Sequence, residues 1–226
     1  AVSFTLAEVV PWGRSFDEYV AMFDLTAREL DSRVLGCGDG PAAFNAELTR
    51  RGGHGVSVDP LYRFTTAAIR SRLEATFETV LAQTRANATE FTWRDIHSVA
   101  ELGRVRRAAM DSFLADYAAG GRAGRYVGGE LPHLPLKDGA FELALCSHLL
   151  FLYSEPLSAA FHVAAIRELR RVAREVRIFP LLELGARPSR HLGSVIADLT
   201  AAGYAVQVRR VPYEFQRGGY EMLVVR

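Results

Sequence analysis

Hydrophobic and polar positions along the chain follow two periods, one typical of helices and one typical of strands. Ser15 followed by Glu18 has the spacing of a capping box, and Phe16, Tyr19 and Phe23 recur at helical spacing. These positions predict an amphipathic helix. Short apolar runs bounded by turn residues predict five buried strands, at residues 33–36, 55–58, 125–127, 141–146 and 175–182.

Helical patterns separate these strands, which favours a parallel sheet with helices on its faces. They cover residues 41–51, 65–87, 99–119, 159–173 and 194–202. Pro41 is predicted in the first turn of its helix, where a missing N–H costs nothing. A crossover between parallel strands normally needs one helix, but two long patterns separate the second and third strands. Residues 63–124 are therefore predicted to form a helical insertion.

Two further strands are predicted at residues 205–215 and 220–225, across the turn "QRGGY". Such a hairpin gives the sheet an antiparallel C-terminal edge strand. The pattern as a whole predicts a doubly wound, mostly parallel α/β sheet in a single domain over residues 1–226.

Composition and charge exclude several classes of partner. The chain has 226 residues, of which 49% are apolar and 23% charged, which is enough for a sizeable core. The net charge of +1 predicts no field that recruits nucleic acid or an anionic membrane. Basic runs at Arg104, Arg106 and Arg107, and again at 167–174, are interpreted as solvated helix faces. No apolar run reaches the roughly 20 residues of a membrane span.

The two cysteines, Cys37 and Cys146, form no pairing ladder and are predicted to pack as free thiols on neighbouring strands. This cysteine usage predicts a reducing, cytoplasmic location. The six histidines show no metal-ligand spacing, so no metal is expected.

The stretch "RVLGCGDGP" places three glycines in five positions directly after a predicted strand. Turns of this kind let backbone N–H groups face a ligand. A dinucleotide fingerprint would require a third glycine where Pro41 stands, and the P-loop lysine and hydroxyl pair is absent. The carboxylate of Asp39 would repel a diphosphate. The turn therefore favours a ligand that is cationic or carries an amine, and opposes a nicotinamide-dependent oxidoreductase.

Three segments together resemble the class I S-adenosylmethionine-dependent methyltransferase family: "VLGCGDG", the acid in "VSVDP", and "GGELPHLPLKDGAFELALCSHLLFLY". The resemblance runs from about residue 33 to the C-terminus, apart from the helical insertion. It implies a Rossmann-like doubly wound, mostly parallel seven-stranded sheet. It also implies methyl transfer from S-adenosylmethionine, with S-adenosylhomocysteine as product.

The resemblance also assigns the residues that bind the cofactor. The glycine turn would pack against the methionine and ribose portions of the cofactor. Asp59 would accept hydrogen bonds from the ribose hydroxyls. Glu130 would contact the adenine amino group, with Leu131 as an apolar neighbour of the ring. Many family members carry an acid where this chain has Val34, so Asp39 or main-chain carbonyls would hold the amino group. The expected cofactor-binding residues are Gly36, Cys37, Gly38, Asp39, Gly40, Asp59, Pro60, Glu130, Leu131 and Ser147.

His148 and Tyr153 are the candidate catalytic residues, because the fourth strand delivers "CSHLLFLY" to the edge of the sheet where ligands bind. His148 would be a base or would orient the acceptor. The alternative for each residue is a hydrogen-bonded side chain in a turn. A non-catalytic nucleoside-binding or interaction protein with the same fold is the main alternative function.

Two helical regions are candidates for contact with the acceptor or a partner. Residues 1–30, with Trp12, Arg14 and Tyr19, are interpreted as a lid over the cofactor or as packing on the sheet. The insertion would enclose a small-molecule acceptor or provide a homodimer face, unless its apolar residues are ordinary core. The apolar residues concerned are Phe77, Leu81, Phe113, Leu114 and Tyr117.

Overall fold

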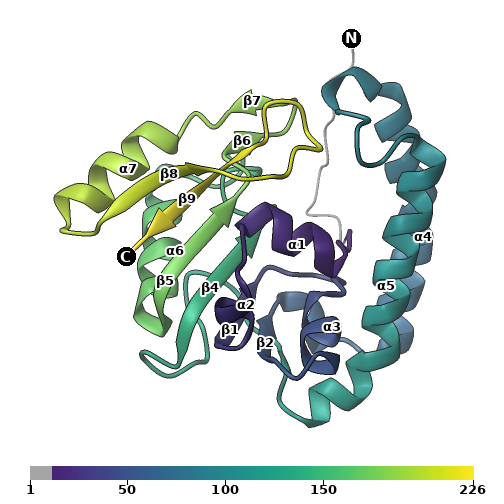
Figure 1. Ribbon diagram of the computed structural model, residues 1–226, viewed down its shortest axis with the longest axis horizontal. Helices are drawn as coiled ribbons and strands as arrows, with labels where there is room; N and C mark the ends of the chain where they lie inside the picture. Colours follow the sequence, from purple (N-terminus) through teal and green to yellow (C-terminus); the bar gives the residue numbers. More distant parts are fainter. Residues whose placement is uncertain (1–11) are drawn as a thin grey trace.

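A computed structural model describes residues 12–226 of the chain, so the first part of the expected lid, residues 1–11, lies outside the described residues. The central feature is a seven-stranded sheet with the order β3-β2-β1-β4-β5-β9-β8 (Figure 1). Its strands are β1 (Arg33–Cys37), β2 (His54–Val58), β3 (Tyr126–Val127), β4 (Phe141–Ser147), β5 (Ala173–Phe179), β8 (Val206–Arg210) and β9 (Glu221–Val225).

The five strands from β3 to β5 pair in parallel, and β9 pairs antiparallel with both of its neighbours. The C-terminal hairpin thus brings antiparallel pairing to this edge of the sheet, and the outermost strand β8 runs in the same direction as β5. This arrangement confirms the Rossmann-like, mostly parallel sheet. Cys37 and Cys146 are paired positions on β1 and β4, and both are buried free thiols, as predicted.

Helices cover both faces of the sheet (Figure 1). One face buries α6 (Ala159–Val172) and α7 (Leu192–Ala201), whose apolar residues join those of the parallel strands in one core cluster. The other face packs α1 (Phe16–Phe23) and α3 (Phe44–Arg50) against alternate strand positions. Two-sided burial explains why these strands read as continuous apolar runs.

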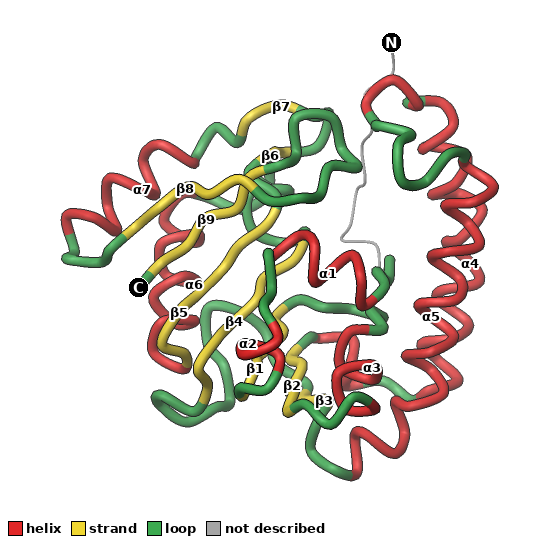
Figure 2. Tube along the Cα trace, viewed as in Figure 1, coloured by secondary structure: helices red, strands yellow, loops and turns green. Residues whose placement is uncertain are grey.

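The predicted insertion forms a helical hairpin of α4 (Thr66–Ala86) and α5 (Val99–Arg122), with short 3₁₀ turns η1 (Pro60–Arg63) and η2 (Ala88–Glu90). The hairpin stands beside α3, with its tip near the loop between β8 and β9 (Figure 2). The five apolar residues considered as an acceptor wall or dimer face are buried in the core that this hairpin makes with η1 and β3. They are therefore core, and other residues of the hairpin face the cavity described below.

Several predicted boundaries differ from the structure. The third helix, α3, begins at Phe44, so Pro41 belongs to the preceding turn and not to the helix. The predicted strand 205–215 ends at Arg210, because the chain then leaves the sheet to form a loop. A short helix α2 (Ala27–Leu30) and a small two-stranded sheet of β6 (Leu182–Glu183) and β7 (Arg187–Pro188) lie in stretches where no separate element was predicted.

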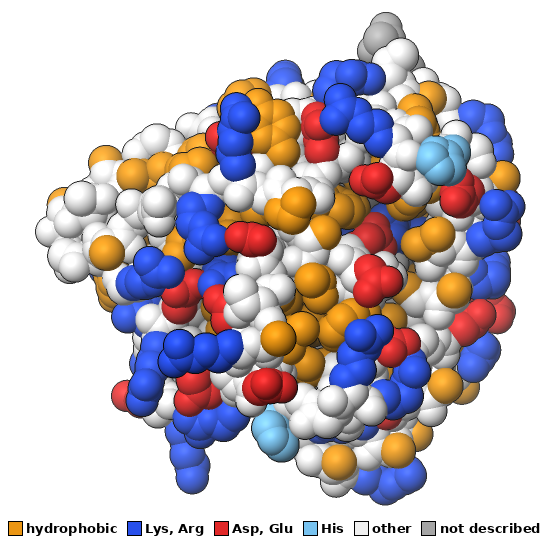
Figure 3. Space-filling view, in the orientation of Figure 1, with side chains coloured by type: hydrophobic (Ala, Val, Ile, Leu, Met, Phe, Trp, Pro, Cys, Tyr) orange, Lys and Arg blue, Asp and Glu red, His pale blue; other side chains and the backbone are white. Residues whose placement is uncertain are grey.

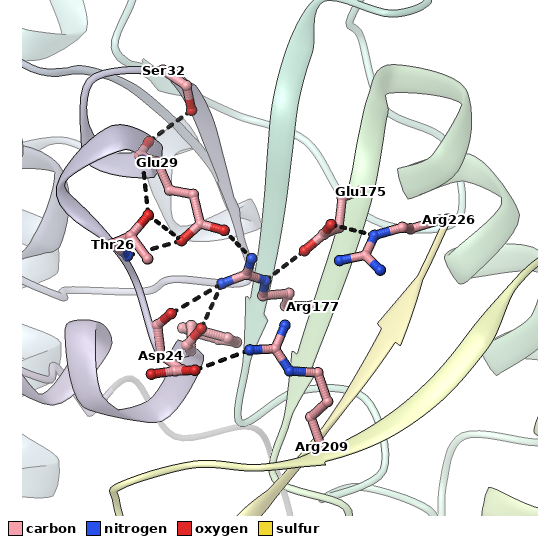
Figure 4. A network of polar contacts seen from close by, with 9 residues as sticks. Asp24, Thr26, Glu29, Ser32, Glu175, Arg177, Arg209 and Arg226 are labelled. Carbon is pink, nitrogen blue, oxygen red and sulfur yellow. Dashed lines mark hydrogen bonds and ion pairs between the residues drawn. The ribbon is translucent and has the colours of Figure 1, made fainter.

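Arg177 of β5 ties the N-terminal helices to the sheet (Figure 4). Its side chain is buried, donates a hydrogen bond to the carbonyl of Phe23 at 2.7 Å and pairs with Glu29 of α2. Arg209 on the edge strand pairs with Asp24 at 2.9 Å. Asp24 caps α1, whose predicted capping box is present, with Ser15 accepting from the N–H of Glu18. These contacts fix α1, and with it the residues that α1 contributes to the cavity.

Candidate active site

A cavity of about 590 Å³ lies at the carboxyl ends of β1, β2 and β4. Strand order reverses between β1 and β4, and this switch point is where open α/β sheets bind ligands. Every predicted site residue except Gly36 lines the cavity. A Cβ on Gly36 would lie 1.7 Å from a carboxylate oxygen of Asp39, so Gly36 is needed to admit that carboxylate.

Two N–H groups of the glycine turn donate hydrogen bonds to the end of β2 and the residue after it. Gly38 and Gly40 have φ angles of 71° and 53°, in the left-handed region that favours glycine. The N–H of Gly38 donates to the carbonyl of Val58 at 2.9 Å, and that of Gly40 donates to Asp59 at 2.9 Å. These two N–H groups therefore already have acceptors inside the chain, which does not suit a phosphate cradle.

Asp39 points beneath the turn. Its two carboxylate oxygens accept hydrogen bonds from the hydroxyls of Tyr19 at 2.8 Å and Ser57 at 2.6 Å. Burial raises the pKa of Asp39 to about 6, against the lowering effect of those two hydrogen bonds. Asp39 lines the cavity, and its carboxylate is already held by two hydroxyls.

Replacing Asp39 with asparagine is expected to remove a pH-dependent loss of stability. Because the folded pKa is raised, the contribution of this group is fully present below pH about 4 and is lost as the pH rises through about 6. A difference of about two pKa units between the unfolded and folded states corresponds to about 2–3 kcal/mol of unfolding free energy. Urea unfolding of both proteins at pH 4 and pH 8 measures this. An Asp39→Asn variant with the same pH dependence as the wild type would contradict the assignment.

Asp59 ends β2 and supports the glycine turn. One carboxylate oxygen accepts the N–H of Gly40 and the other accepts the N–H of Leu61 at 2.8 Å, which caps η1. Burial raises the pKa of Asp59 above its ordinary value. A carboxylate oxygen has two acceptor positions, so each still has one for a ligand hydroxyl. Asp59 therefore caps η1 and remains able to accept further hydrogen bonds at the cavity.

Glu130 and Leu131 form the rim on the same side. Glu130 is exposed and pairs with the exposed Arg63 at 3.3 Å, whereas Leu131 is buried. Phe64 lies next to Arg63 in the chain, lines the cavity and is 55% exposed, unusually high for a phenylalanine in this protein. This end of the cavity thus combines an acidic group with flat apolar surface.

Another part of the cavity wall carries Ser147, which ends β4, and His148 and Tyr153, which follow this strand. Nδ1 of His148 lies 2.8 Å from the hydroxyl oxygen of Ser147. His148 has φ of 53°, a conformation that histidine adopts more readily than most residues but still at some cost. Burial, together with the charges of Arg14 and Arg106, holds the pKa of His148 well below its ordinary value. Its imidazole is therefore neutral at neutral pH.

A buried charge cluster borders this wall, with members from α1, α5 and the C-terminal loop. Arg106 is fully buried and makes a bidentate pair with Glu18, with N–O distances of 2.5 and 2.7 Å. The hydroxyl of Tyr213 donates to the same carboxylate at 2.9 Å. The interpretation of the 104–107 run as a solvated face is therefore wrong for Arg106, although Arg104 and Arg107 are exposed. The fourth member of the cluster, Arg14, lines the cavity.

The tip of the helical hairpin contacts the β8–β9 loop across the cavity. In this clasp, defined as residues 88–93 and 214–217, the N–H of Thr92 donates to the carbonyl of Phe215 at 2.7 Å. The N–H of Arg217 donates to the carbonyl of Glu90 at 2.8 Å. The rings of Phe91 and Phe215 stack with centroids 5.0 Å apart. Both segments line the cavity, so the clasp connects its two sides.

The sequence pointed to Trp12, Arg14, Tyr19 and Phe215, which all line the cavity, but not to the other residues of the insertion and the clasp that do so. A signal for Arg106 does exist. It lies four residues after Leu102 and four before Met110, both buried, and so belongs to the apolar side of α5. The additional lining residues of the insertion and the clasp are Phe64, Arg72, Val80, Thr84, Glu90, Phe91, Leu102, Arg106 and Gln216.

Charge on the visible face is mixed, because the space-filling view shows basic and acidic side chains interspersed over it (Figure 3). Within residues 12–226, no three or more histidine, cysteine or acidic side chains gather as a metal site would require. None of the helices in this part of the chain is long and apolar enough to cross a membrane.

Comparison with known proteins identifies one family. No protein-family model matches the chain. The uncharacterized protein MJ0045 of Methanocaldococcus jannaschii is 30% identical over 222 residues, which cover 98% of this chain and 97% of that protein. The chain therefore belongs to the family of this archaeal protein.

Solved structures of methyltransferases resemble the chain more distantly. A SAM-dependent methyltransferase from Aquifex aeolicus is 15% identical with a TM-score of 0.44, over 93% of this chain and 88% of that one. Magnesium protoporphyrin IX methyltransferase from Synechocystis, solved with bound SAM, is 12% identical with a TM-score of 0.46, over 93% and 76%. The fold is defined by the strand order described above, and not by these scores.

Proposed function

We propose that the chain is an S-adenosylmethionine-dependent methyltransferase that acts on a small-molecule acceptor. The observation that carries the proposal is the convergence, in one cavity at the switch point of the sheet, of the glycine turn, Asp59 and a neutral His148. The resemblance of the sequence motifs to class I methyltransferases supports the same conclusion.

The residues of the cavity fit a sulfonium nucleoside. Gly40 has open space where a Cβ would point, and the carboxylates of Asp39 and Asp59 favour a cation over a phosphate. Asp59 would accept the ribose hydroxyls through its remaining acceptor positions, and Glu130 would accept the adenine amino group while Leu131 contacts the ring. The further residues proposed to contact this ligand are Gly36, Cys37, Gly38, Pro60 and Ser147.

S-adenosylmethionine supplies an activated methyl group, so positioning of the acceptor provides most of the rate. In the proposed reaction His148 takes the proton of the acceptor. In the tautomer that this role requires, Nδ1–H donates to the hydroxyl oxygen of Ser147, and the lone pair of Nε2 is left for the proton of the acceptor. Tyr153, buried in the same wall, would orient the acceptor. A base with a lowered pKa stays unprotonated at neutral pH, as this role requires.

Calorimetric titration with S-adenosylmethionine and S-adenosylhomocysteine, with NADH as control, tests the proposal. We expect micromolar binding of the first two and none of NADH. A folded protein that binds neither sulfur nucleoside, or that binds NADH instead, would contradict the proposed cofactor. His148→Gln is expected to bind S-adenosylhomocysteine as the wild type does, because the imidazole faces the acceptor and not the nucleoside.

A second candidate function is binding of the nucleoside without turnover. Val34 favours it, because this position on β1 is buried among apolar residues and offers no carboxylate to the amino group of a ligand. Slow conversion of bound S-adenosylmethionine to S-adenosylhomocysteine, lost in His148→Gln, separates the two functions. Tight binding with no conversion supports the non-catalytic function.

A further inference from the structure

The cavity wall beside His148 carries more positive charge than its own carboxylate neutralises. Arg14 and Arg106 both line the cavity, and Glu18 is the carboxylate between them. Both oxygens of Glu18 are bound by Arg106, whose side chain is 1% exposed. Tyr213 adds a neutral hydroxyl to the same carboxylate. Among residues 12–226, one full positive charge, on Arg14, is left over.

The guanidinium of Arg14 has few polar partners among the described residues. Among the described residues, its side chain makes one hydrogen bond, a long contact of 3.5 Å from Nη1 to the carbonyl of Trp12, and its buried Nε has no partner there. Within residues 12–226, no carboxylate lies within ion-pairing distance of it. Burial and the charge of Arg106 lower the pKa of Arg14. Arg14 is half-buried, and a partly desolvated cation without a counter-ion is costly, so proteins usually pair such groups.

Arg14 and His148 line the same cavity. The groups that it influences electrostatically are Glu18, Tyr19, Arg106, Tyr213 and His148. Apolar side chains line much of the same cavity, among them Trp12, Leu102, Leu152, Leu157, Phe161 and Phe215.

We propose that the methyl acceptor is a small carboxylic acid with an apolar body, and that Arg14 binds its carboxylate beside His148. This assignment rests on the proposed methyltransferase function and adds the chemical class of the acceptor. A guanidinium suits a carboxylate because its paired N–H groups match the two oxygens.

The reaction balances with these residues. A hydroxyl or amine of the acceptor forms the new bond to the methyl carbon as the carbon–sulfur bond breaks, with the bonding pair remaining on sulfur. The proton of that hydroxyl or amine passes to Nε2 of His148 and from there to water. The carboxylate on Arg14 takes no part in bond formation, so Arg14 positions the acceptor.

The experiment uses full-length protein saturated with S-adenosylhomocysteine, so that the carboxylate of the nucleoside is already bound. The probes are two matched pairs, 4-hydroxybenzoate with 4-hydroxybenzamide and 4-hydroxycinnamate with 4-hydroxycinnamamide. Each pair differs by one charge at nearly constant shape. Ligand-observed NMR titration gives the affinities for wild type, Arg14→Met, Arg14→Lys and the control Arg104→Met, which removes an exposed arginine of α5 outside the cavity.

We expect the wild type to bind at least one acid about tenfold or more tightly than its amide. Arg14→Met should abolish this ratio, Arg14→Lys should retain part of it, and Arg104→Met should keep it. S-adenosylhomocysteine binding should change less than about twofold in all four proteins, which also shows that the variants fold.

Other outcomes overturn the assignment in distinguishable ways. Equal affinities for acid and amide, or no binding of either acid, would show that Arg14 does not select an acceptor carboxylate. A large loss of S-adenosylhomocysteine affinity in folded Arg14→Met would place the carboxylate of the nucleoside on Arg14 instead. Failure of the wild type to bind S-adenosylhomocysteine at all would overturn the proposed function first, and the acceptor assignment with it.

Discussion

Glu18→Gln is expected to destabilise the protein by about 3–5 kcal/mol, the usual cost of removing one partner of a buried ion pair. The reason is that Arg106, fully buried, would lose its counter-charge and face Arg14 across the same space. Urea unfolding at pH 7 measures the change. Glu142→Gln is the matched control, since Glu142 pairs with Arg33 at the surface, where ion pairs contribute little.

The effect of Glu18→Gln should depend on pH with a defined sign. Arg106 counteracts burial and lowers the pKa of Glu18 to about 2. Because the folded pKa is depressed, the stabilisation by Glu18 is present above pH about 4.5 and is lost as the pH falls through about 2. Wild type and variant should therefore converge in stability in acid. A variant as stable as wild type at pH 7 would show that Arg106 finds another counter-charge.

Asp59→Ala is expected to weaken binding of S-adenosylhomocysteine by about 1.5–3 kcal/mol, roughly 10- to 150-fold. The variant would lose the acceptor positions proposed for the ribose, and the N–H groups of Gly40 and Leu61 would lose their partner. Calorimetric titration measures the affinity, and circular dichroism confirms that the variant is folded.

Glu130→Ala provides the comparison for Asp59→Ala. The side chain of Glu130 is 61% exposed and pairs with the exposed side chain of Arg63. Loss of Glu130 should therefore weaken binding of S-adenosylhomocysteine much less. An Asp59→Ala protein that is folded and binds with unchanged affinity would leave Asp59 with its capping role alone. The order of the two effects, rather than either alone, tests the proposed placement of the nucleoside.

Local chemistry explains which elements the sequence could predict. The capping box of Ser15 and Glu18 acts within one helical turn, and apolar runs define strands wherever both sheet faces are covered. The glycine turn and Asp59 could be placed together because consecutive parallel strands end at the same edge. Predicted cavity residues therefore came mostly from strand ends.

The remaining residues depend on contacts between distant parts of the chain. Glu18 and Arg106 are 88 positions apart, and each alone reads as a surface charge on an amphipathic helix. Thr92 and Glu214, hydrogen-bonded across the clasp, are 122 positions apart. Periodicity describes one element at a time, so it could not show that the tip of the hairpin meets the β8–β9 loop. Periodicity also could not show that Arg106 binds both oxygens of Glu18, so that Arg14 has no counter-charge among residues 12–226.

The clasp also limits the shape of any acceptor. The hairpin leaves the sheet after β2, and its tip returns to the sheet through the loop between β8 and β9, so chain and contacts together make a loop around this side of the cavity. The middle of a long polymer cannot be laid into such a loop without breaking the contacts at Thr92 and Arg217. A compact molecule or a free chain end can pass through it. We therefore expect the path of the backbone to exclude the middle of a long polymer from this side of the cavity, whichever side chain binds the acceptor.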